Sequence, residues 1–528
     1  MKQIYMFGLI VAGLIATSAL AYSNSERFDS TTGTTAAQSG TAESTCSPNV
    51  TACDFDSKTT ACTPINATFA TVDNPAGDGK CGCLTLKGGT NDCVVLMLDR
   101  CLDFTRNPAI IRLKILGPKA GAVVSVRLSP KTSQNPQPVF CTVRTTKSGE
   151  WEELTFDFSS QKLESNWYQK MIVYFNRGKE NKTPGEKWYF DDITVPDDDL
   201  TPLCLFQRPK DQRPPKPNRS YKWISNSTAN PDVLTPAESP DGNWWLFMRG
   251  GDGSYSRLGV YTQKASSFNP LGPWNYYDDN PIIDCNVDGR VDNRGVIDPS
   301  PVRGKDGKIY LFYKGQQKNS DPMANSHPTV LFATSTDGYE YSEAEIWKEG
   351  IGISDLVVDD TGRFYLFIAR RVYVFDDPYA DSDAATVYTD IVDKGDGPAN
   401  FDRYSINGMK IKRLPGVNKW FMFYQGSAIH DDFPDRFHVA LSDDLIHWTK
   451  VKNDQPLFTR GPRGSWDQGA IWAPEVFEYN GMLYMYYEGW GTRGPVKNRD
   501  RRYFKPAHSE IGIATCPTED FLRWCGLK

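Results

Sequence analysis

Histidine is scarce in this chain, with only 5 among 528 residues, and the net charge of -6 leaves no excess of basic residues. The few histidines argue against a metal centre built from His327, His430 and His508. The acidic balance argues against nucleic acid or an anionic membrane as the main partner. After the N-terminus no run of 18 apolar residues occurs, so no later segment is expected to span a bilayer.

The N-terminus has the features of a secretory leader. Lys2 precedes an apolar run over residues 4–15, and Ala19-Leu20-Ala21 offers a small-x-small cleavage site. We predict a signal peptide over residues 1–21 and a secreted, extracellular protein without a membrane segment after cleavage; an uncleaved anchor is the alternative. Residues 22–45 are rich in Ser, Thr, Gly and Ala and are expected to be a flexible spacer.

Cysteine, in contrast, is abundant, and the 12 residues fit an oxidising compartment. Eight lie between residues 46 and 141 and four lie beyond, so disulfides within each domain are predicted, with Cys516 and Cys525 as a C-terminal staple. The spacing of Cys81 and Cys83 admits a metal site, but with few histidines nearby disulfides are favoured. Five Asn-x-Ser/Thr sites predict a glycoprotein in a glycosylating host: Asn49, Asn66, Asn181, Asn218 and Asn226.

Residues 46–196 are predicted to form a Cys-rich β-sandwich, because short alternating or apolar stretches are separated by Gly, Pro and Asn turns. The stretches GEWEELTFDFSS (149–160) and KWYFDDITVP (187–196) resemble the last strands of the galactose-binding-like jelly rolls found beside secreted polysaccharide-degrading enzymes. That group often binds sugars or a structural calcium ion. The resemblance implies such a calcium site at Asp191 and Asp192; the alternative is a hydrogen bond to a neighbouring loop.

A linker is expected next. Residues 197–222 hold an acidic run followed by a Pro-rich, basic run, which predicts an extended and only partly ordered segment. It separates the sandwich from residues 223–528.

Residues 223–528 contain an internal repeat. An inner stretch such as NPDVL (230–234), DPSPV (298–302) or SDLVV (354–358) precedes an aromatic stretch such as NWWLFMRG, KIYLFYKG or RFYLFIAR. YSINGMKI and KWFMFYQG follow, and IWAPEVFEYNGMLYMYYEG (471–489) holds both parts around a turn at 479–481. The aromatic stretches start at residues 243, 308, 363, 419 and 482, so the spacings are 65, 55, 56 and 63.

A period of this size with several strands per unit predicts a five-bladed β-propeller, and therefore an all-β chain. Third strands are predicted at 258–266, 330–338, 371–378, 437–448 and 511–524. Because the innermost strand of each blade faces the central axis, equivalent residues should ring one cavity. The set aligned in this way is Asp232, Asp298, Asp355, the Ser405/Asn407 position and Glu475.

Several carboxylates facing one cavity are costly for structure alone, because like charges in a desolvated pocket repel one another and raise their pKa values. Raised pKa values suit a general acid beside a general base, and glycoside hydrolysis needs two carboxylates across one bond. A single aspartate of this kind is more often a turn or strand cap. The shared register favours a catalytic interpretation.

At these residues the chain resembles the five-bladed propeller glycosidases of glycoside hydrolase families 43, 62, 32 and 117. The stretches ANPDVL and IDPSPV are similar to that group's Asp-bearing inner strands. The resemblance implies Asp232 as the general base and Asp298 as the residue that orients the acid. The group's third-blade Glu is replaced by Asp355, so the acid is either Asp355 or Glu475, and we favour Glu475 because Trp472 can form an apolar wall beside it.

We therefore expect a secreted, monomeric glycoside hydrolase that acts on a polysaccharide or oligosaccharide by inversion and requires no cofactor. A non-catalytic glycan-binding or adhesion protein is the alternative, and a polysaccharide lyase using Tyr404 or His430 is a third. The cationic residues Arg294, Lys314, Arg370 and Arg371 also suggest an acidic glycan. The expected substrate-binding residues are Arg249, Arg294, Lys314, Arg370, Gln425 and Trp472, with Glu488 close by.

Overall fold

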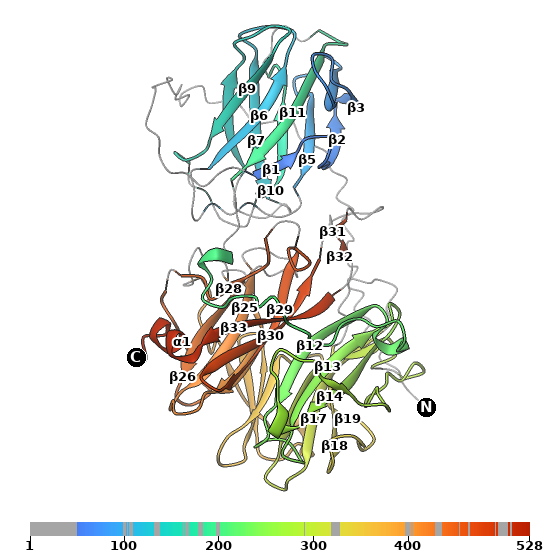
Figure 1. Cartoon of the computed structure of the whole chain (residues 1–528), viewed down its shortest axis with the longest axis vertical. Coiled ribbons are helices and arrows are strands. Elements are labelled where there is room, and N and C mark those ends of the chain that lie inside the picture. The colour runs from blue at the N-terminus through green and yellow to red at the C-terminus, as the bar shows by residue number, and fades with distance from the viewer. Residues whose placement is uncertain are drawn as a thin grey trace, which may run out of the picture. The chain divides into compact units, whose positions relative to one another are not determined.

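The computed structural model describes residues 50–98, 102, 104, 109–130, 138–161, 163, 168–177, 183–196, 201–289, 291–317, 328–395, 402, 405–427, 436–453, 455–462, 465–491, 493–494, 505–506 and 509–528. The predicted signal peptide and spacer, Tyr404 and the three histidines named above lie outside these residues. The described part consists mainly of strands (Figure 1). None of its helices is long and apolar enough to cross a membrane.

The N-terminal strands form two antiparallel sheets that share one apolar core. The alternation in β6 shows why: Ile111, Leu113 and Ile115 are buried, whereas Arg112 and Lys114 between them are not. The first sheet has the order β3 (Ala67–Asp73), β4 (Lys80–Leu86), β11 (Lys187–Val195), β6 (Ile110–Leu116), β9 (Trp151–Asp157), with β1 (Val50–Cys53) on β11. The second has the order β2 (Ala61–Ile65), β5 (Cys93–Met97), β10 (Tyr168–Tyr174), β7 (Val123–Pro130), β8 (Val139–Arg144).

The C-terminal strands form antiparallel groups in chain order, each built from a first strand, an aromatic second strand and one or more outer strands. The first strands are β12 (Ser227–Leu234), β16 (Gly295–Arg303), β20 (Asp355–Val358), β24 (Ser405–Arg413) and β29 (Ala470–Tyr479). The second strands are β13 (Trp244–Gly251), β17 (Ile309–Gln316), β21 (Phe364–Ile368), β25 (Trp420–Ser427) and β30 (Met482–Trp490).

The outer strands are β14 (Ser256–Gln263), β15 (Asn275–Tyr276), β18 (Thr329–Ser335), β19 (Glu345–Glu349), β22 (Arg371–Phe375), β23 (Thr386–Thr389), β26 (Arg436–Ser442), β27 (Thr449–Lys450), β28 (Phe458–Thr459) and β33 (Ser509–Pro517). A separate pair is formed by β31 (Arg493–Gly494) and β32 (Lys505–Pro506). Short 3-10 turns span Thr201–Leu203, Lys222–Ile224, Ala265–Ser267 and Ser382–Ala384.

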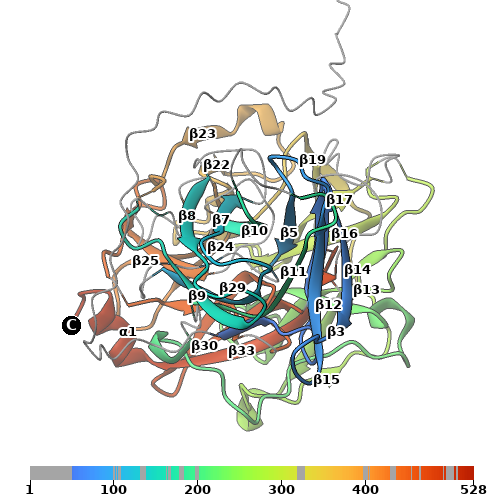
Figure 2. The ribbon, with the colours of Figure 1, turned by 90° about the horizontal axis from the view of Figure 1, so that it is seen from above.

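The first strands form a closed ring. In chain order β12 contacts β16, β16 contacts β20, β20 contacts β24 and β24 contacts β29, and β29 contacts β12 in turn. Figure 2 shows β24 and β29 near the middle, with β15 and β23 at the periphery. The predicted all-β, propeller-like architecture is therefore confirmed, and equivalent residues of the first strands face a common axis.

The turn predicted between β29 and β30 is present and has a clear local cause. Asn480 and Gly481 both adopt positive φ, 53° and 78°. Two consecutive positive φ values define the tight hairpin turn whose twist matches that of the flanking strands, and Asn-Gly is its preferred sequence.

The prediction of a strand over residues 511–524 is wrong for residues 518–524. The strand β33 ends at Pro517, and Thr518–Trp524 form helix α1. Pro517 occupies the N-cap position, and Glu519 and Asp520 lie in the first turn. Phe521, Leu522 and Trp524 are buried.

The predicted linker is ordered over residues 201–222. Leu205 and Phe206 donate backbone hydrogen bonds to Pro456 and Leu457, at 2.9 and 3.0 Å. The Arg208 guanidinium lies 2.7 Å from the buried carboxylate of Asp467. These contacts attach the segment to the propeller-like unit.

Candidate functional site

A bulge at the same level marks most of the first strands. The pairing register shifts in β12, β16, β24 and β29, and one residue at each shift has positive φ. Bulges re-aim side chains, and non-glycine residues in this conformation cost on the order of 1–3 kcal/mol each and cluster at functional sites. The residues and their φ angles are Asn230 46°, Asp298 55°, Gly408 50° and Ala473 51°.

One residue of each first strand faces the axis, and in the four strands with a bulge it directly follows the bulge. We call these residues the buried layer. Its members pair with an aromatic residue of the second strand in every group. They are Asp232, Ser300, Asp355, Lys410 and Glu475, joined by Lys412 from β24. The structure thus brings Asp232, Asp355 and Glu475 together, as the comparison of the repeats predicted. In β16, however, Ser300 belongs to the buried layer, and Asp298 lies two residues before it, at the bulge.

Two lysines bridge the three carboxylates of the buried layer. Lys410 Nζ donates to Asp232 and lies 3.3 Å from Asp355 Oδ1. Lys412 Nζ lies 2.6 Å from Glu475 Oε1 and 3.7 Å from Asp232 Oδ1. This ionic network is the main feature of the site that the sequence alignment missed.

Backbone and hydroxyl donors complete the network. Asp355 accepts hydrogen bonds from Ser300 Oγ at 2.9 Å and from the backbone N–H of Ile411 at 2.7 Å. Glu475 Oε1 accepts the backbone N–H of Val233 at 3.1 Å. Glu475 Oε2, in contrast, is buried and has no hydrogen-bond partner among the described residues.

Burial controls protonation in this layer. Glu475 has no exposed surface and Asp232 is 2 % exposed. Burial raises the pKa of Glu475 to about 8 although Lys412 opposes the shift, and it also raises the pKa of Asp232 against Lys410. Three carboxylates face two ammonium groups, so one negative charge is uncompensated, and a proton on Glu475 removes it.

We expect this proton to appear in the pH dependence of stability. The pKa of Glu475 rises from 4.5 to about 8 on folding, so its contribution is fully present below pH 4.5 and is lost as pH rises through about 8. The denaturation midpoint of the wild type should therefore fall between pH 5 and 8 more steeply than that of Glu475→Gln. Equal slopes of the denaturation midpoint against pH in the two proteins would contradict a raised pKa for Glu475. Glu519→Gln changes an exposed glutamate and serves as the matched control, with the slope of the wild type.

A second set of side chains lies one step further along the strands, and we call it the open layer. It comprises Asp298 at its bulge, the residue before the glycine in β13, β17, β25 and β30, and one tryptophan of β29. Its members are Arg249, Asp298, Lys314, Gln425, Trp472 and Glu488. Asp298 and Lys314 are 19 % and 22 % exposed and lie 2.9 Å apart, so this layer reaches solvent.

Glu488 is the second carboxyl group of the open layer. Its Oε1 accepts Trp490 Nε1 at 2.5 Å and lies 3.4 Å from the Arg249 guanidinium, which is 18 % exposed. Burial raises the pKa of Glu488, Arg249 opposes the shift, and the nearby charge of Asp298 adds to it. The open layer therefore pairs a solvent-reaching carboxylate with a carboxyl group that holds its proton more tightly than usual.

Other predicted binding residues lie elsewhere. Arg294 is exposed before β16. Arg370 donates to the Val392 carbonyl at 2.6 Å and pairs with Asp390 at 2.8 Å. Of the arginine and lysine positions predicted for an acidic glycan, only Lys314 belongs to the open layer, and it is already paired.

The sequence held a signal for the correct alignment. A proline precedes the buried-layer residue in NPDV, DPSP and APEV, because proline lacks an N–H and is tolerated at a bulge. Alignment on this proline places Asp232, Ser300 and Glu475 at one level and Asp298 above them. Nothing comparable marks Lys410, which follows Met409.

No metal site is evident in the part of the chain that the structure describes, where no group of three or more His, Cys, Asp or Glu is arranged to hold an ion. Asp192 pairs with Lys114 at 2.6 Å. Burial raises the pKa of Asp191 to about 6. The donor set at these two aspartates does not fit a calcium ion.

The described cysteines form no disulfide, in contrast to the sequence-based expectation. Some thiols are nevertheless neighbours. Burial, together with Cys53, raises the pKa of Cys62 to about 12, and burial with Cys516 raises that of Cys525. The predicted staple between Cys516 and Cys525 is absent, although the two residues interact.

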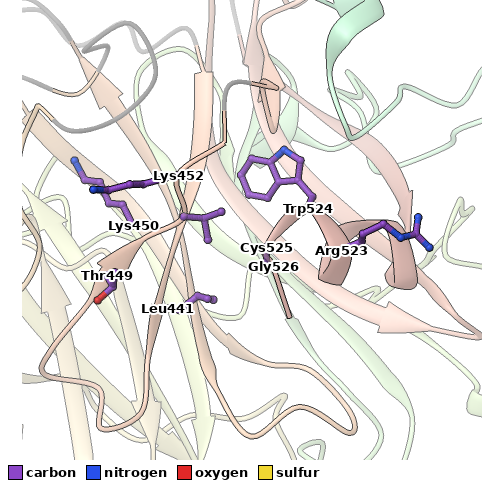
Figure 3. Close-up of a pocket in the computed structure, with 9 residues that line it drawn as sticks. Leu441, Thr449, Lys450, Lys452, Arg523, Trp524, Cys525 and Gly526 are labelled. Carbon is purple, nitrogen blue, oxygen red and sulfur yellow. The ribbon is translucent and has the colours of Figure 1, made fainter. Parts of the chain in front are cut away.

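A separate hollow of about 310 Å³ lies between β26, β27 and α1, and none of its lining residues belongs to the buried layer or the open layer (Figure 3). Its lining includes Lys452, Arg523 and Trp524 but no Asp or Glu. It lacks the carboxyl pair that acid–base chemistry requires, so the open layer remains the candidate site.

No family model matches the chain. Solved structures with a similar arrangement include a glycosyl hydrolase from Bacteroides ovatus, 17 % identical, covering 61 % of this chain and 97 % of that one with a TM-score of 0.40. A Cellvibrio cellulosa α-L-arabinanase complexed with arabinohexaose is 12 % identical, covering 54 % and 91 % with a TM-score of 0.36. A structure from the work on glycoside hydrolase family 130 enzymes that target β-1,2-mannosidic linkages in Candida mannan is 18 % identical, covering 60 % and 94 % with a TM-score of 0.38.

Proposed function

We propose that this chain is a secreted glycoside hydrolase whose reaction takes place in the open layer of a five-bladed propeller formed by residues 223–528. The jelly-roll module over residues 46–196 is its accessory domain. The observation that carries the proposal is the pair Asp298 and Glu488, two carboxyl groups of the open layer, of which one is 19 % exposed and the other has a pKa raised by burial. Such a pair is what hydrolysis of a glycosidic bond requires.

The roles follow from exposure and charge. The side chain of Asp298 is 19 % exposed, and its carboxylate can accept a proton from an incoming water molecule. Glu488 holds its proton more tightly because it is buried, so it can protonate the leaving oxygen. A base and an acid that act in one step invert the anomeric carbon.

Asp232 and Glu475, the base and acid expected from the sequence, take no part in proton transfer in this mechanism. Glu475 has no exposed surface, and Asp232 is held by Lys410 and Lys412. Because Glu475 has no exposed atom, it cannot exchange a proton with a substrate, whereas the side chain of Glu488 is 3 % exposed. In the proposal Asp232 and Glu475 hold the first strands, and hence the bulge that carries Asp298, in register.

The second candidate is a non-catalytic glycan-binding protein. It is favoured by the ion pairs Lys314–Asp298 and Arg249–Glu488, which engage both carboxyl groups of the open layer. In this alternative the same layer holds sugar hydroxyls without turnover.

The two candidates are separated by incubating the full-length protein with a panel of plant and algal polysaccharides and following the products by ¹H NMR. We expect hydrolysis of at least one polymer, with the inverted anomer as the first product. Release of the retained anomer would contradict the single-step mechanism. Saturable binding of a polymer that is never cleaved would support the glycan-binding candidate instead.

A further inference from the structure

Three N–H groups of the open layer have no acceptor among the residues that the structure describes. Arg249 Nε, Gln425 Nε2 and Trp472 Nε1 are buried and make no hydrogen bond to any described residue. Gln425 is only 2 % exposed. Each buried donor left unpaired costs on the order of 1–3 kcal/mol, so a ligand that supplies acceptors gains affinity from all three.

The three donors belong to one continuous surface. Gln425 Oε1 accepts the backbone N–H of Ala473 at 3.1 Å, beside Trp472. Trp472 is the cross-strand partner of Glu488, and Glu488 Oε1 lies 3.4 Å from the Arg249 guanidinium. The donors therefore follow one another along the open layer and flank the proposed acid.

The orientation of the Gln425 amide is fixed from two sides. The bond from Ala473 holds Oε1, which directs Nε2 away from the backbone. On the neighbouring strand Gly408 has a φ of 50°, and a Cβ there would lie 2.4 Å from the amide carbon. Only glycine leaves room for the amide in this position at the bulge. The backbone of β24 and the bond from Ala473 therefore hold the unpaired Gln425 Nε2–H in place.

The charges of the layer determine what kind of acceptor fits. Lys314 is paired with Asp298 and Arg249 with Glu488, so an incoming anion meets no uncompensated cation among these residues. The open positions are instead an amide N–H, an indole N–H and one N–H of a guanidinium that is already paired. Such donors match hydroxyl and ring oxygens, while Asp298 can accept from a hydroxyl group.

The tryptophans supply the apolar part of the same surface. The rings of Trp472 and Trp490 are nearly parallel, with centroids 6.5 Å apart and an interplanar angle of 23°. Trp490 is fixed by its hydrogen bond to Glu488, and Trp472 is partly exposed. A sugar ring has an apolar C–H face, and an indole plane offers it a rigid contact at low entropic cost.

We infer that the open layer is a subsite for one uncharged sugar unit, held through its hydroxyl and ring oxygens by Arg249, Gln425 and Trp472. The inference deepens the proposed glycoside hydrolase by naming its substrate class. It replaces the acidic glycan suggested by the cationic residues of the sequence, since Arg294 and Arg370 lie outside the layer.

The test follows the Trp472 indole N–H by NMR in full-length protein labelled with ¹⁵N-tryptophan, its resonance assigned with Trp472→Phe. The probes are the methyl glycosides of glucose, galactose, mannose, xylose and arabinose, each titrated to saturation, with methyl glucuronoside and methyl galacturonoside as the charged counterparts. We expect at least one neutral glycoside to shift the resonance and both acidic glycosides to bind about tenfold more weakly than it or worse, because an extra negative charge meets Asp298.

Trp472→Phe keeps a ring and removes the N–H, so it should weaken the binding neutral glycoside about tenfold. An acidic glycoside that binds as tightly as the binding neutral glycoside, or a panel in which no neutral glycoside shifts Trp472, would overturn the inference. Cleavage of an acidic polysaccharide together with tight acidic binding would leave the hydrolase proposal standing. Binding of a neutral glycoside without hydrolysis of any polymer would support the subsite and contradict the hydrolase proposal.

Discussion

Replacing Lys410 by methionine is expected to destabilise the propeller by about 3–5 kcal/mol, because the change leaves buried carboxylates without their counter-charge. Lys410 Nζ is the cation that contacts both Asp232 and Asp355, and each of these aspartates is 2 % exposed. Methionine fills a similar volume, so the loss reports the charge rather than a cavity. The midpoint of thermal unfolding should fall on the order of 10 °C.

Two further variants make this result specific. Lys419→Met removes a surface lysine that lies 2.6 Å from Asp443, and should change stability by no more than about 1 kcal/mol. Adding Asp232→Asn to Lys410→Met removes one uncompensated charge and should recover part of the loss. If Lys410→Met were as stable as Lys419→Met, the buried network would not hold the ring of first strands together.

The second large effect is expected on activity. Asp298→Asn and Glu488→Gln should each lower kcat/KM on the hydrolysed polymer by about 10²–10⁴, since each removes one proton-transfer group and keeps the side-chain size. Both variants should retain the thermal midpoint of the wild type within a few degrees, because neither residue is part of the network around Lys410. The measurement is steady-state hydrolysis by purified variants.

Matched changes in the buried layer and on the surface act as controls for this prediction. Glu475→Gln removes a carboxyl group that has no exposed surface and should leave the pH profile of kcat/KM in place. Glu478→Gln, three residues further along β29, should leave turnover unchanged. A loss confined to Glu475→Gln would return the acid to the buried layer, as the sequence alone suggested.

Much of the fold could be predicted because its signals are local. Aromatic second strands recur with a regular spacing, and Asn480-Gly481 encodes its hairpin turn directly. The end of the chain could not be assigned by the same rule. The expected third strand includes Thr518 to Trp524, but Pro517 and the acidic first turn begin a helix there.

The site was predicted less completely, for a reason specific to bulges. Asp232, Asp355 and Glu475 do meet at the axis, but a bulge shifts the pleat and moves Asp298 to another level. Lys410 lies between carboxylates that are distant in sequence, so its role depends on ring closure and not on any local pattern. The distinction between a buried layer and an open layer therefore needed coordinates.

The role of Glu488 as proton donor is tested most directly by its dependence on the leaving group. In a 2,4-dinitrophenyl glycoside of the hydrolysed sugar, the dinitrophenolate group leaves without being protonated. The leaving oxygen of the natural linkage needs a proton from an acid. The account predicts that Glu488→Gln keeps near wild-type kcat/KM on the dinitrophenyl substrate and loses it on the natural one, while Asp298→Asn loses both. Equal losses of Glu488→Gln on the two substrates would contradict it and leave Glu488 as a structural partner of Arg249.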